Sequence, residues 1–389
     1  MTAILLNYLV KIKIFDIYLF SDREIQENEY EHPKCIKRII IINNFFEIIE
    51  KTNINILIYE KKNISEMQKL NNLGNKKVIY YHHSSILGYF YNSVSLQIYK
   101  VYKESKYIIN LVPFENDYLF KKWGIKTIFM NNFVPYDFNS VIPSDLSSKI
   151  IIMIGRAGDK NKRFDMGIKA MKYIIKEIPE SELKIISKLY KISDLQKIVN
   201  DSKLERNVKF EGFSNNPQKY YEKASLHFFP TRCESFGLVL SEAKIFGIPT
   251  ILMGLDYVSI SKGGTDIIYD DNPESLAKEA IKILKNKKYR QKLGKQARKS
   301  IKSFNNNILF KQWVKLILSV YKGDSHYENL RKQHKEISQK ESLKILESQI
   351  KLLKMRRPSI FNNITTALIE NFTYIDNLIE KSRENNTKI

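Results

Sequence analysis

At its most informative point the sequence reads Cys233-Glu234-Ser235-Phe236-Gly237-Leu238-Val239-Leu240-Ser241-Glu242-Ala243, with two carboxylates eight positions apart around a Ser-Phe-Gly step. The apolar run before it, residues 226–230, predicts a strand, and residues 238–246, closed by Gly247 and Pro249, predict a helix. A strand, a tight loop and a helix aim backbone N–H groups and the positive end of a helix dipole at one point. We therefore expect an anion, most simply a phosphate, at this helix start.

The two glutamates of this stretch fit a bound diphosphate. Glu234 lies just before the predicted helix and Glu242 lies inside it, so at 1.5 Å rise per residue their carboxylates stand on the order of 10 Å apart. One carboxylate could then lie on each side of the diphosphate of a nucleotide-sugar. Acidic residues are also favoured near helix starts without any ligand, so two surface glutamates are the simpler alternative.

A second segment repeats the same arrangement. Residues 150–156 predict a buried strand that ends in Gly155-Arg156, a polar loop follows over 159–165, and a helix is predicted from Met166 to Lys176. The loop carries Arg156 and Lys162, and these cations suit a diphosphate, since a guanidinium binds phosphate bidentately and an ammonium acts as a point charge. The alternative is a solvated basic loop in a lysine-rich chain.

Together these segments resemble the retaining nucleotide-sugar glycosyltransferases of family 4, which have the GT-B fold. The resemblance covers roughly residues 76–320 and is strongest over 150–300. The residues that carry it are Gly155-Arg156 with Lys162-Arg163-Phe164-Asp165, Val208-Lys209-Phe210-Glu211-Gly212-Phe213, the Glu234 and Glu242 pair with Phe236-Gly237, and Ala243 through Phe246-Gly247-Ile248-Pro249. The resemblance implies an α/β protein with two Rossmann-like domains that face a cleft.

The resemblance also implies an activity. Such an enzyme moves a sugar from a nucleotide-diphosphate sugar, with retention at the anomeric carbon, to a glycan, lipid-linked or phosphate-bearing polymer acceptor. We expect Glu242 to take the ribose hydroxyls, because a carboxylate accepts two hydrogen bonds from a diol, and Glu234 to hold the donor sugar. The remaining expected site residues are Phe236, Gly237 and Leu238 on the phosphate, Gly212 and Phe213 beside the base, and Asn132 near the cleft.

In the first part of the chain the candidate for chemistry is His83. It lies in Tyr80-Tyr81-His82-His83-Ser84-Ser85, after a predicted strand, at the edge where open α/β sheets place ligands. The resemblance implies that His83 faces the donor sugar; without it, a packing histidine is the better interpretation. Adjacent histidines point in different directions and form a poor metal pair. We expect no catalytic metal and no cofactor, since Arg156, Lys162 and the helix start can neutralise the leaving diphosphate.

Strands and helices alternate along the chain. We expect an acceptor-side domain over residues 1–134, a linker over 135–148 and a nucleotide-sugar domain over 149–302. A crossover helix over 303–324 and a helical tail over 325–389 follow. In the first domain the predicted strands are 16–20, 38–42, 55–59, 77–81, 107–110 and 127–130. A helix is already predicted over residues 3–9, and no glycine precedes Gly74, so this domain is expected to lack the usual first strand and glycine-rich loop.

The amino-acid composition indicates the number of domains, the cellular compartment and the kind of partner. With 389 residues and 43% hydrophobic residues the chain can form two packed domains. Two cysteines, Cys35 and Cys233, give no disulfide framework, which favours a reducing, cytoplasmic compartment. No convincing signal peptide or eighteen-residue apolar span is found. The formal charge of +22 implies an anionic partner, either a membrane surface or a phosphate-bearing acceptor; the alternative is that much of it reflects a composition rich in Lys, Ile and Asn. Without a nucleic-acid motif we expect no nucleic-acid partner.

Two rival functions stay open. One is a sugar-nucleotide epimerase of the same fold, against which the Arg156, Lys162, Glu234 and Glu242 set argues. The other is a non-catalytic sugar-nucleotide-binding subunit, which the unusual N-terminal start motivates. A serine hydrolase is not indicated, because the sequence has no Gly-x-Ser-x-Gly motif.

Overall fold

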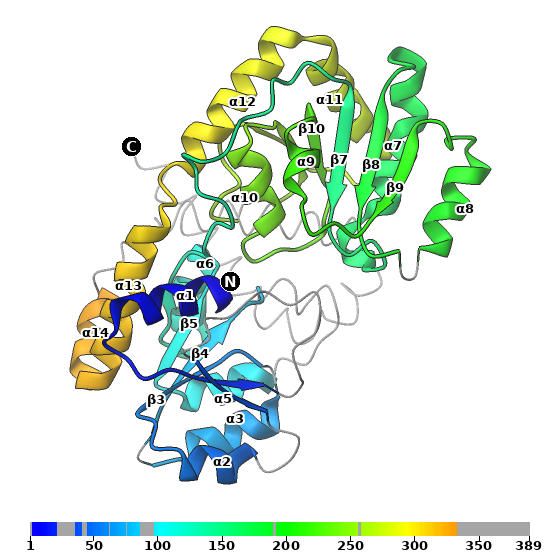
Figure 1. Cartoon of the computed structure of the whole chain (residues 1–389). Coiled ribbons are helices and arrows are strands. Elements are labelled where there is room, and N and C mark those ends of the chain that lie inside the picture. Colours follow the sequence, from blue (N-terminus) through cyan, green and yellow to red (C-terminus); the bar gives the residue numbers. More distant parts are fainter. Residues whose placement is uncertain are drawn as a thin grey trace, which may run out of the picture. The chain divides into compact units, whose positions relative to one another are not determined.

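The computed structural model describes residues 2–21, 36–40, 45–61, 63–74, 76–85, 97–189, 192–255 and 258–332. They form two compact α/β units (Figure 1). The first unit holds the described residues up to Ser140 and those from Lys302 onward, and the second unit comprises Val141–Ile301. Both units are built on parallel sheets, which need helices on their faces.

The first unit begins with α1 (Thr2–Ile12) and a parallel strand pair, β1 (Tyr18–Ser21) and β2 (Lys37–Ile40). Its main sheet has four parallel strands in sequence order: β3 (Ile56–Tyr59), β4 (Lys77–His82), β5 (Tyr107–Asn110) and β6 (Ile128–Phe129). Helix α2 (Phe45–Lys51) precedes β3, and the helices between the four strands are α3 (Ile64–Asn71), α5 (Gln97–Glu104) and α6 (Pro113–Trp123).

Two C-terminal helices belong to the same unit, α13 (Asn306–Lys322) and α14 (Asp324–Lys332). Trp313 is the fully buried centre of α13. At the end of this helix the Lys77 ammonium donates to the carbonyls of Val320 and Tyr321 at 2.9 and 2.7 Å. A cation at a helix C-terminus satisfies carbonyls that have no partner within the helix, so it fixes α13 to β4.

The second unit has six parallel strands: β7 (Ile150–Ile154), β8 (Glu182–Ile186), β9 (Val208–Gly212), β10 (Leu226–Phe229), β11 (Thr250–Met253) and β12 (Thr265–Ile268). Its helices are α7 (Phe164–Glu177), α8 (Ser193–Asp201), α9 (Gln218–Tyr221), α10 (Leu238–Ile245), α11 (Pro273–Lys285) and α12 (Lys287–Ile301), with a 3-10 turn η1 at Lys160–Lys162.

The core of this unit holds α7 tightly against the sheet. Ile151, Met153 and Phe228 are fully buried, as parallel strands covered on both faces require. A methyl group on Gly167 would lie 2.3 Å from the Met153 sulfur and 3.4 Å from the Phe228 ring. Glycine is therefore needed at position 167 for the helix to approach β7 and β10 this closely, and the loop before α7 is anchored with it.

The strand order of the second sheet is β12-β11-β10-β7-β8-β9. The chain leaves β7 toward β8 and β9 and then returns to the other side of β7 as β10. In such a sheet the order reverses between β7 and β10, and ligands bind outside the carboxyl ends of the strands at this switch point. The loops after β7 and β10 are the two segments that the sequence predicts as anion-binding.

The predicted α/β class is confirmed, with two parallel sheets and C-terminal helices. The helix predicted over residues 3–9 is found as α1, and the start of the predicted tail is α14. The rest of that tail, residues 333–389, lies outside the described residues. The boundaries and roles assigned to the domains stay predictions.

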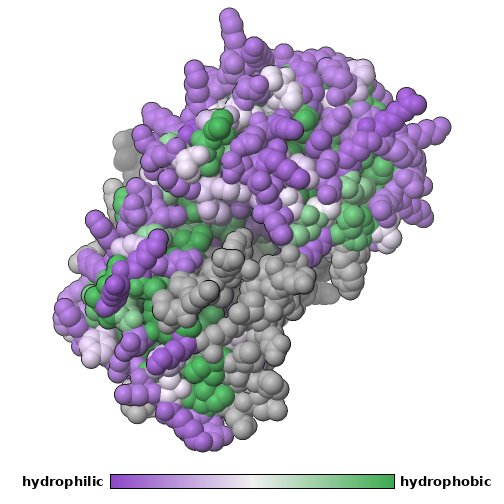
Figure 2. Space-filling view, in the orientation of Figure 1, coloured by the Kyte–Doolittle hydropathy of each residue, from purple (hydrophilic) through white to green (hydrophobic). Residues whose placement is uncertain are grey.

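No helix in the described ranges is long and apolar enough to cross a bilayer. The face drawn in Figure 2 carries mostly hydrophilic residues over the described elements.

Candidate active site

The loop after β7 carries the two predicted cations. Asp159 caps η1 by accepting a hydrogen bond from the Asn161 N–H at 3.0 Å, and Lys162 ends this turn. The Arg156 guanidinium lies 3.0 Å from the Asp159 carboxylate, and its side chain is 82% exposed. Arg163 is different: it is buried and paired with Asp271 at 2.6 Å, so it fixes the start of α7.

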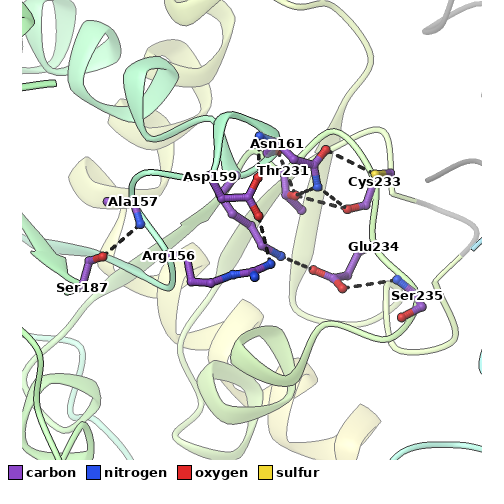
Figure 3. A network of polar contacts seen from close by, with 10 residues as sticks. Arg156, Ala157, Asp159, Asn161, Ser187, Thr231, Cys233, Glu234 and Ser235 are labelled. Atoms are coloured by element: carbon purple, nitrogen blue, oxygen red, sulfur yellow. Dashed lines mark hydrogen bonds and ion pairs between the residues drawn. The ribbon is translucent and has the colours of Figure 1, made fainter. Parts of the chain in front are cut away.

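Asn161 joins the loop after β7 to the loop after β10 (Figure 3). Its side-chain amide donates to the Cys233 carbonyl at 3.1 Å, and the Cys233 thiol donates to its Oδ1 at 3.2 Å. Its backbone carbonyl accepts from the Arg232 N–H at 2.9 Å and from the Thr231 hydroxyl at 3.1 Å. We call these contacts between the two loops the Asn161 clamp. Burial raises the pKa of the Cys233 thiol to about 12, so this thiol is a neutral hydrogen-bond donor within the clamp.

Lys162 and Glu234 meet between the two joined loops. The Lys162 ammonium donates to Glu234 Oε2 at 2.6 Å, and the two side chains are 21% and 19% exposed. The other oxygen of Glu234 accepts from the Ser235 N–H at 3.3 Å. A cation and a carboxylate therefore stand side by side at the switch point, still reachable by a ligand.

The start of α10 supplies backbone donors beside this pair. Gly237 precedes the helix with φ +82° and no side-chain cap. A Cβ at this position would lie 3.3–3.4 Å from Phe229, Glu234 and Leu240, so both the backbone conformation and the space require glycine. The first N–H groups of a helix have no acceptor within the helix. Phe236 is buried, so it can serve a ligand only through its backbone.

Glu242 lies one turn into α10. Its Oε2 accepts a hydrogen bond from the Tyr221 hydroxyl at 2.5 Å, and the Tyr221 ring stacks on Phe246 with centroids 5.1 Å apart. Burial raises the pKa of the Glu242 carboxyl to about 7. A carboxylate held in such surroundings gains from further hydrogen-bond donors, and a vicinal diol supplies two.

Gly212 ends β9 and Phe213 follows it, at the same edge of the sheet. Gly212 has φ +76°, and its carbonyl accepts from the Ser187 N–H at 3.0 Å. The Phe213 ring is 51% exposed, and the Lys188 ammonium lies 5.4 Å from its centroid. An exposed aromatic face at this edge is suited to a planar base.

The first unit holds His83 and Asn132, and it is described by itself. His83 follows β4; its ring lies 4.1 Å from the Tyr81 ring, and its Nε2 lies 3.7 Å from the Glu60 carboxylate. The neighbouring His82 is buried, with its Nδ1 2.9 Å from the Tyr102 hydroxyl. The two histidines thus have separate surroundings. Asn132 is buried and accepts from the N–H of the next residue at 3.0 Å.

The structure therefore brings Lys162 and Glu234 into contact, with Arg156 in the same loop and Gly237, Leu238 and Glu242 on the adjoining helix. Sequence reasoning missed Asn161, Thr231 and Tyr221. Asn161 lies inside the quoted polar loop and could have been singled out, but Tyr221 meets Glu242 only through folding. The described part of the chain contains no group of three His, Cys, Asp or Glu side chains placed to hold a metal ion.

Two α/β units, each built on parallel strands, are the organisation of GT-B proteins. Known structures confirm this fold. Sucrose-phosphate synthase from Thermosynechococcus elongatus matches with a TM-score of 0.66 and 17% identity, over 82% of this chain and 92% of that one. A variant of TarM from S. aureus, in complex with Fondaparinux, alpha-GlcNAc-glycerol and UDP, matches with a TM-score of 0.58 and 20% identity, over 67% of this chain and 55% of that one.

Residues 138–300 match the family described as glycosyl transferases group 1, in agreement with the resemblance drawn from the motifs. Among curated relatives, the poly(glycerol-phosphate) alpha-glucosyltransferase of Bacillus subtilis (strain 168) is 28% identical over 177 residues, 44% of this chain and 26% of the relative. The chain spans between about a quarter and a half of the length of the curated relatives it matches.

Proposed function

We propose that this protein is a glycosyltransferase that moves a sugar from a nucleotide-diphosphate sugar to an acceptor with retention at the anomeric carbon. The observation that carries this proposal is the 2.6 Å contact between Lys162 and Glu234 at the β7/β10 switch point, beside the uncapped start of α10. A cation and helix N–H groups suit a diphosphate, and a carboxylate next to them suits sugar hydroxyls. A serine hydrolase would not need this set. An epimerase of the same fold also binds a nucleotide-sugar, so it is separated from the proposed function by the experiment below.

The proposed reaction breaks the bond between the anomeric carbon and the β-phosphate oxygen and forms a bond from that carbon to an acceptor oxygen. The leaving diphosphate takes up the negative charge, which Lys162, Arg156 and the helix start stabilise. As the new bond forms, the acceptor hydroxyl passes its proton to the leaving β-phosphate oxygen. Glu234 orients the donor sugar and Glu242 the ribose, while Gly212 and Phe213 border the base. His83 of the first unit is assigned to the donor sugar.

We assign the donor to the second unit and the acceptor to the first. Since a solved TarM complex holds UDP, uridine diphosphate sugars are the first donors to test. Since the Bacillus subtilis relative is named for poly(glycerol-phosphate), and this chain carries a net charge of +22, a phosphate-bearing polymer is the first acceptor to test. A reducing, cytoplasmic setting and peripheral attraction to an anionic membrane surface are part of the same proposal.

The experiment incubates the full chain with UDP-glucose or UDP-N-acetylglucosamine, with and without poly(glycerol-phosphate), and measures the UDP released. NMR of the product reads its anomeric configuration. Release that rises with acceptor, together with an α-linked product from the α-linked donor, supports the proposal. Binding of the donor without any release of UDP would instead identify a non-catalytic subunit, and conversion of the donor to an isomeric nucleotide-sugar would identify an epimerase.

A further inference from the structure

Helix α12 is strongly basic. Its 15 residues include seven basic residues and no acidic one. Two of the seven point inward and hold the helix in place: Arg290 donates to the Leu146 carbonyl at 2.9 Å, and Arg298 donates to the Ile245 carbonyl. The others are exposed on the surface: Lys287, Lys288, Lys292, Lys295 and Lys299.

Four of these side chains form a row, which we call the lysine stripe: Lys288, Lys292, Lys295 and Lys299. Steps of four, three and four residues keep all of them on one face of the helix. At 1.5 Å rise per residue the stripe is about 17 Å long, with neighbours about 5–6 Å apart. The stripe is therefore a line of positive charge and not a broad patch.

The lysine stripe has no acidic counterpart in the described part of the chain, since none of its members forms an ion pair there. Lysines on other surface helices of this unit do: Lys169 pairs with Asp165 at 3.3 Å, and Lys282 pairs with Glu279 at 2.8 Å. Like charges four residues apart repel, and lysines in the first turn oppose the helix dipole. Residues that work against their own helix in this way are typical of a binding surface.

The helix that carries the stripe packs closely on α10. A methyl group on Gly294 would lie 2.4 Å from the Gly247 carbonyl oxygen, so α12 lies directly on the end of α10. The opposite end of α10 forms the phosphate edge of the candidate active site. A partner that binds the stripe is thus held on the same unit as the proposed donor site.

We propose that the lysine stripe binds a linear phosphodiester polymer, as a holding surface for the acceptor chain apart from the active site. The class of polymer rests on the proposed function. The line of charges matches a chain of regularly spaced phosphates. Besides the stripe, the exposed residues of α12 are Lys287, Gln291 and Gln296, and none is apolar, so this surface offers nothing to insert into a bilayer. Tyr289 is only partly exposed and its hydroxyl is bonded to Asp266, so no exposed aromatic ring of α12 stacks on bases.

The test uses the full chain and a fluorescently labelled synthetic poly(glycerol-phosphate). The stripe variant replaces Lys288, Lys292, Lys295 and Lys299 by Gln. A matched control variant, with Lys172, Lys197, Lys223 and Lys278 replaced by Gln, removes the same charge from exposed lysines of the same unit that likewise form no ion pair in the described part of the chain. We expect the stripe variant to bind the polymer about tenfold or more weakly at low salt, and its slope of log K against log salt to be shallower by about 3, whereas the control stays close to the wild type.

Equal losses in the stripe and control variants would overturn the inference. So would a stripe variant that binds the polymer normally but loses binding to anionic phosphatidylglycerol vesicles or to single-stranded RNA, since the partner would then be of another class. UDP release from the donor without polymer reads the proposed function separately. We expect this UDP release to be unchanged in the stripe variant. If the wild type releases no UDP, the proposed function is contradicted, and polymer binding still tests the lysine stripe.

Discussion

Replacing Lys162 and Glu234, singly and together, tests whether their ion pair belongs to a ligand site. Two unit charges about 4 Å apart interact by about 4 kcal/mol at an effective dielectric constant near 20, and desolvation of both groups offsets much of this. Because each side chain is about one fifth exposed, we expect a coupling of about 1–2 kcal/mol in the free energy of unfolding, from a cycle of Lys162→Gln, Glu234→Gln and the double variant. Urea unfolding measures it.

The same variants should differ in nucleotide binding. Lys162→Gln removes a charged donor from the phosphate and should weaken UDP by about tenfold or more. Glu234→Gln removes a competing carboxylate, so UDP should bind as well as before or more tightly, while UDP release from the donor falls by about a hundredfold. Calorimetry with UDP and a turnover assay give the two readouts.

A second ion pair provides the control. Lys285 and Glu177 also lie 2.6 Å apart, but both side chains are about half exposed and far in sequence from the site. Their cycle should show no measurable coupling and unchanged UDP affinity. Equal losses of UDP affinity for Lys162→Gln and Glu234→Gln, or wild-type turnover in both, would refute the roles assigned to the pair.

Three further changes probe the surrounding residues. Burial raises the pKa of Glu242 to about 7, so the folded state binds this proton more tightly than the unfolded chain, and the stability it contributes is present below about pH 4.5 and is lost as pH rises through about 7. The difference in free energy of unfolding between Glu242→Gln and the wild type should therefore favour the variant by up to about 3 kcal/mol more at pH 8 than at pH 5, while UDP binding weakens. A difference in urea unfolding that does not change with pH would contradict this. Gly237→Ala should cost about 1–2 kcal/mol and reduce turnover, because φ is +82° and the new methyl group would crowd Glu234; Gly74→Ala, with no atom within 4 Å, is the control, and equal thermal shifts in both would count against the strain. Asn161→Ala should cost about 1–3 kcal/mol and lower donor turnover by separating the two loops, and unchanged values of both would show that no clamp exists.

The individual strands and helices could be predicted from the sequence. The apolar runs at residues 150–154 and 226–229 are buried strands, and the helices after them start near the predicted positions. Pro113 at the start of α6 and Gly124 at its end, with φ +68°, mark that helix in the sequence as well. These features depend on residues close together in the chain, which is why periodicity and capping are sufficient to find them.

The contacts that assemble the site could not be predicted in this way. Lys162 and Glu234 are 72 positions apart, and Tyr221 and Glu242 are 21 positions apart. The sequence predicts that Lys162 binds the phosphate and that Glu234 binds the sugar. The direct contact between these two side chains could not be predicted, because it depends on the placement of β7 beside β10. The clamp by Asn161 has the same origin. The spacing of the lysine stripe is visible in the sequence, but its exposure depends on which face of α12 packs on α10.

A crystal structure of the chain with UDP tests most directly whether the β7/β10 edge is the nucleotide site. We expect the diphosphate within hydrogen-bond distance of the Lys162 ammonium and of the N–H groups at the start of α10, and the ribose hydroxyls at the Glu242 carboxyl. Phe213 should lie beside the base. UDP bound at another edge of the sheet, or bound here with Lys162 still paired only with Glu234 and Glu242 only with Tyr221, would contradict the assignment.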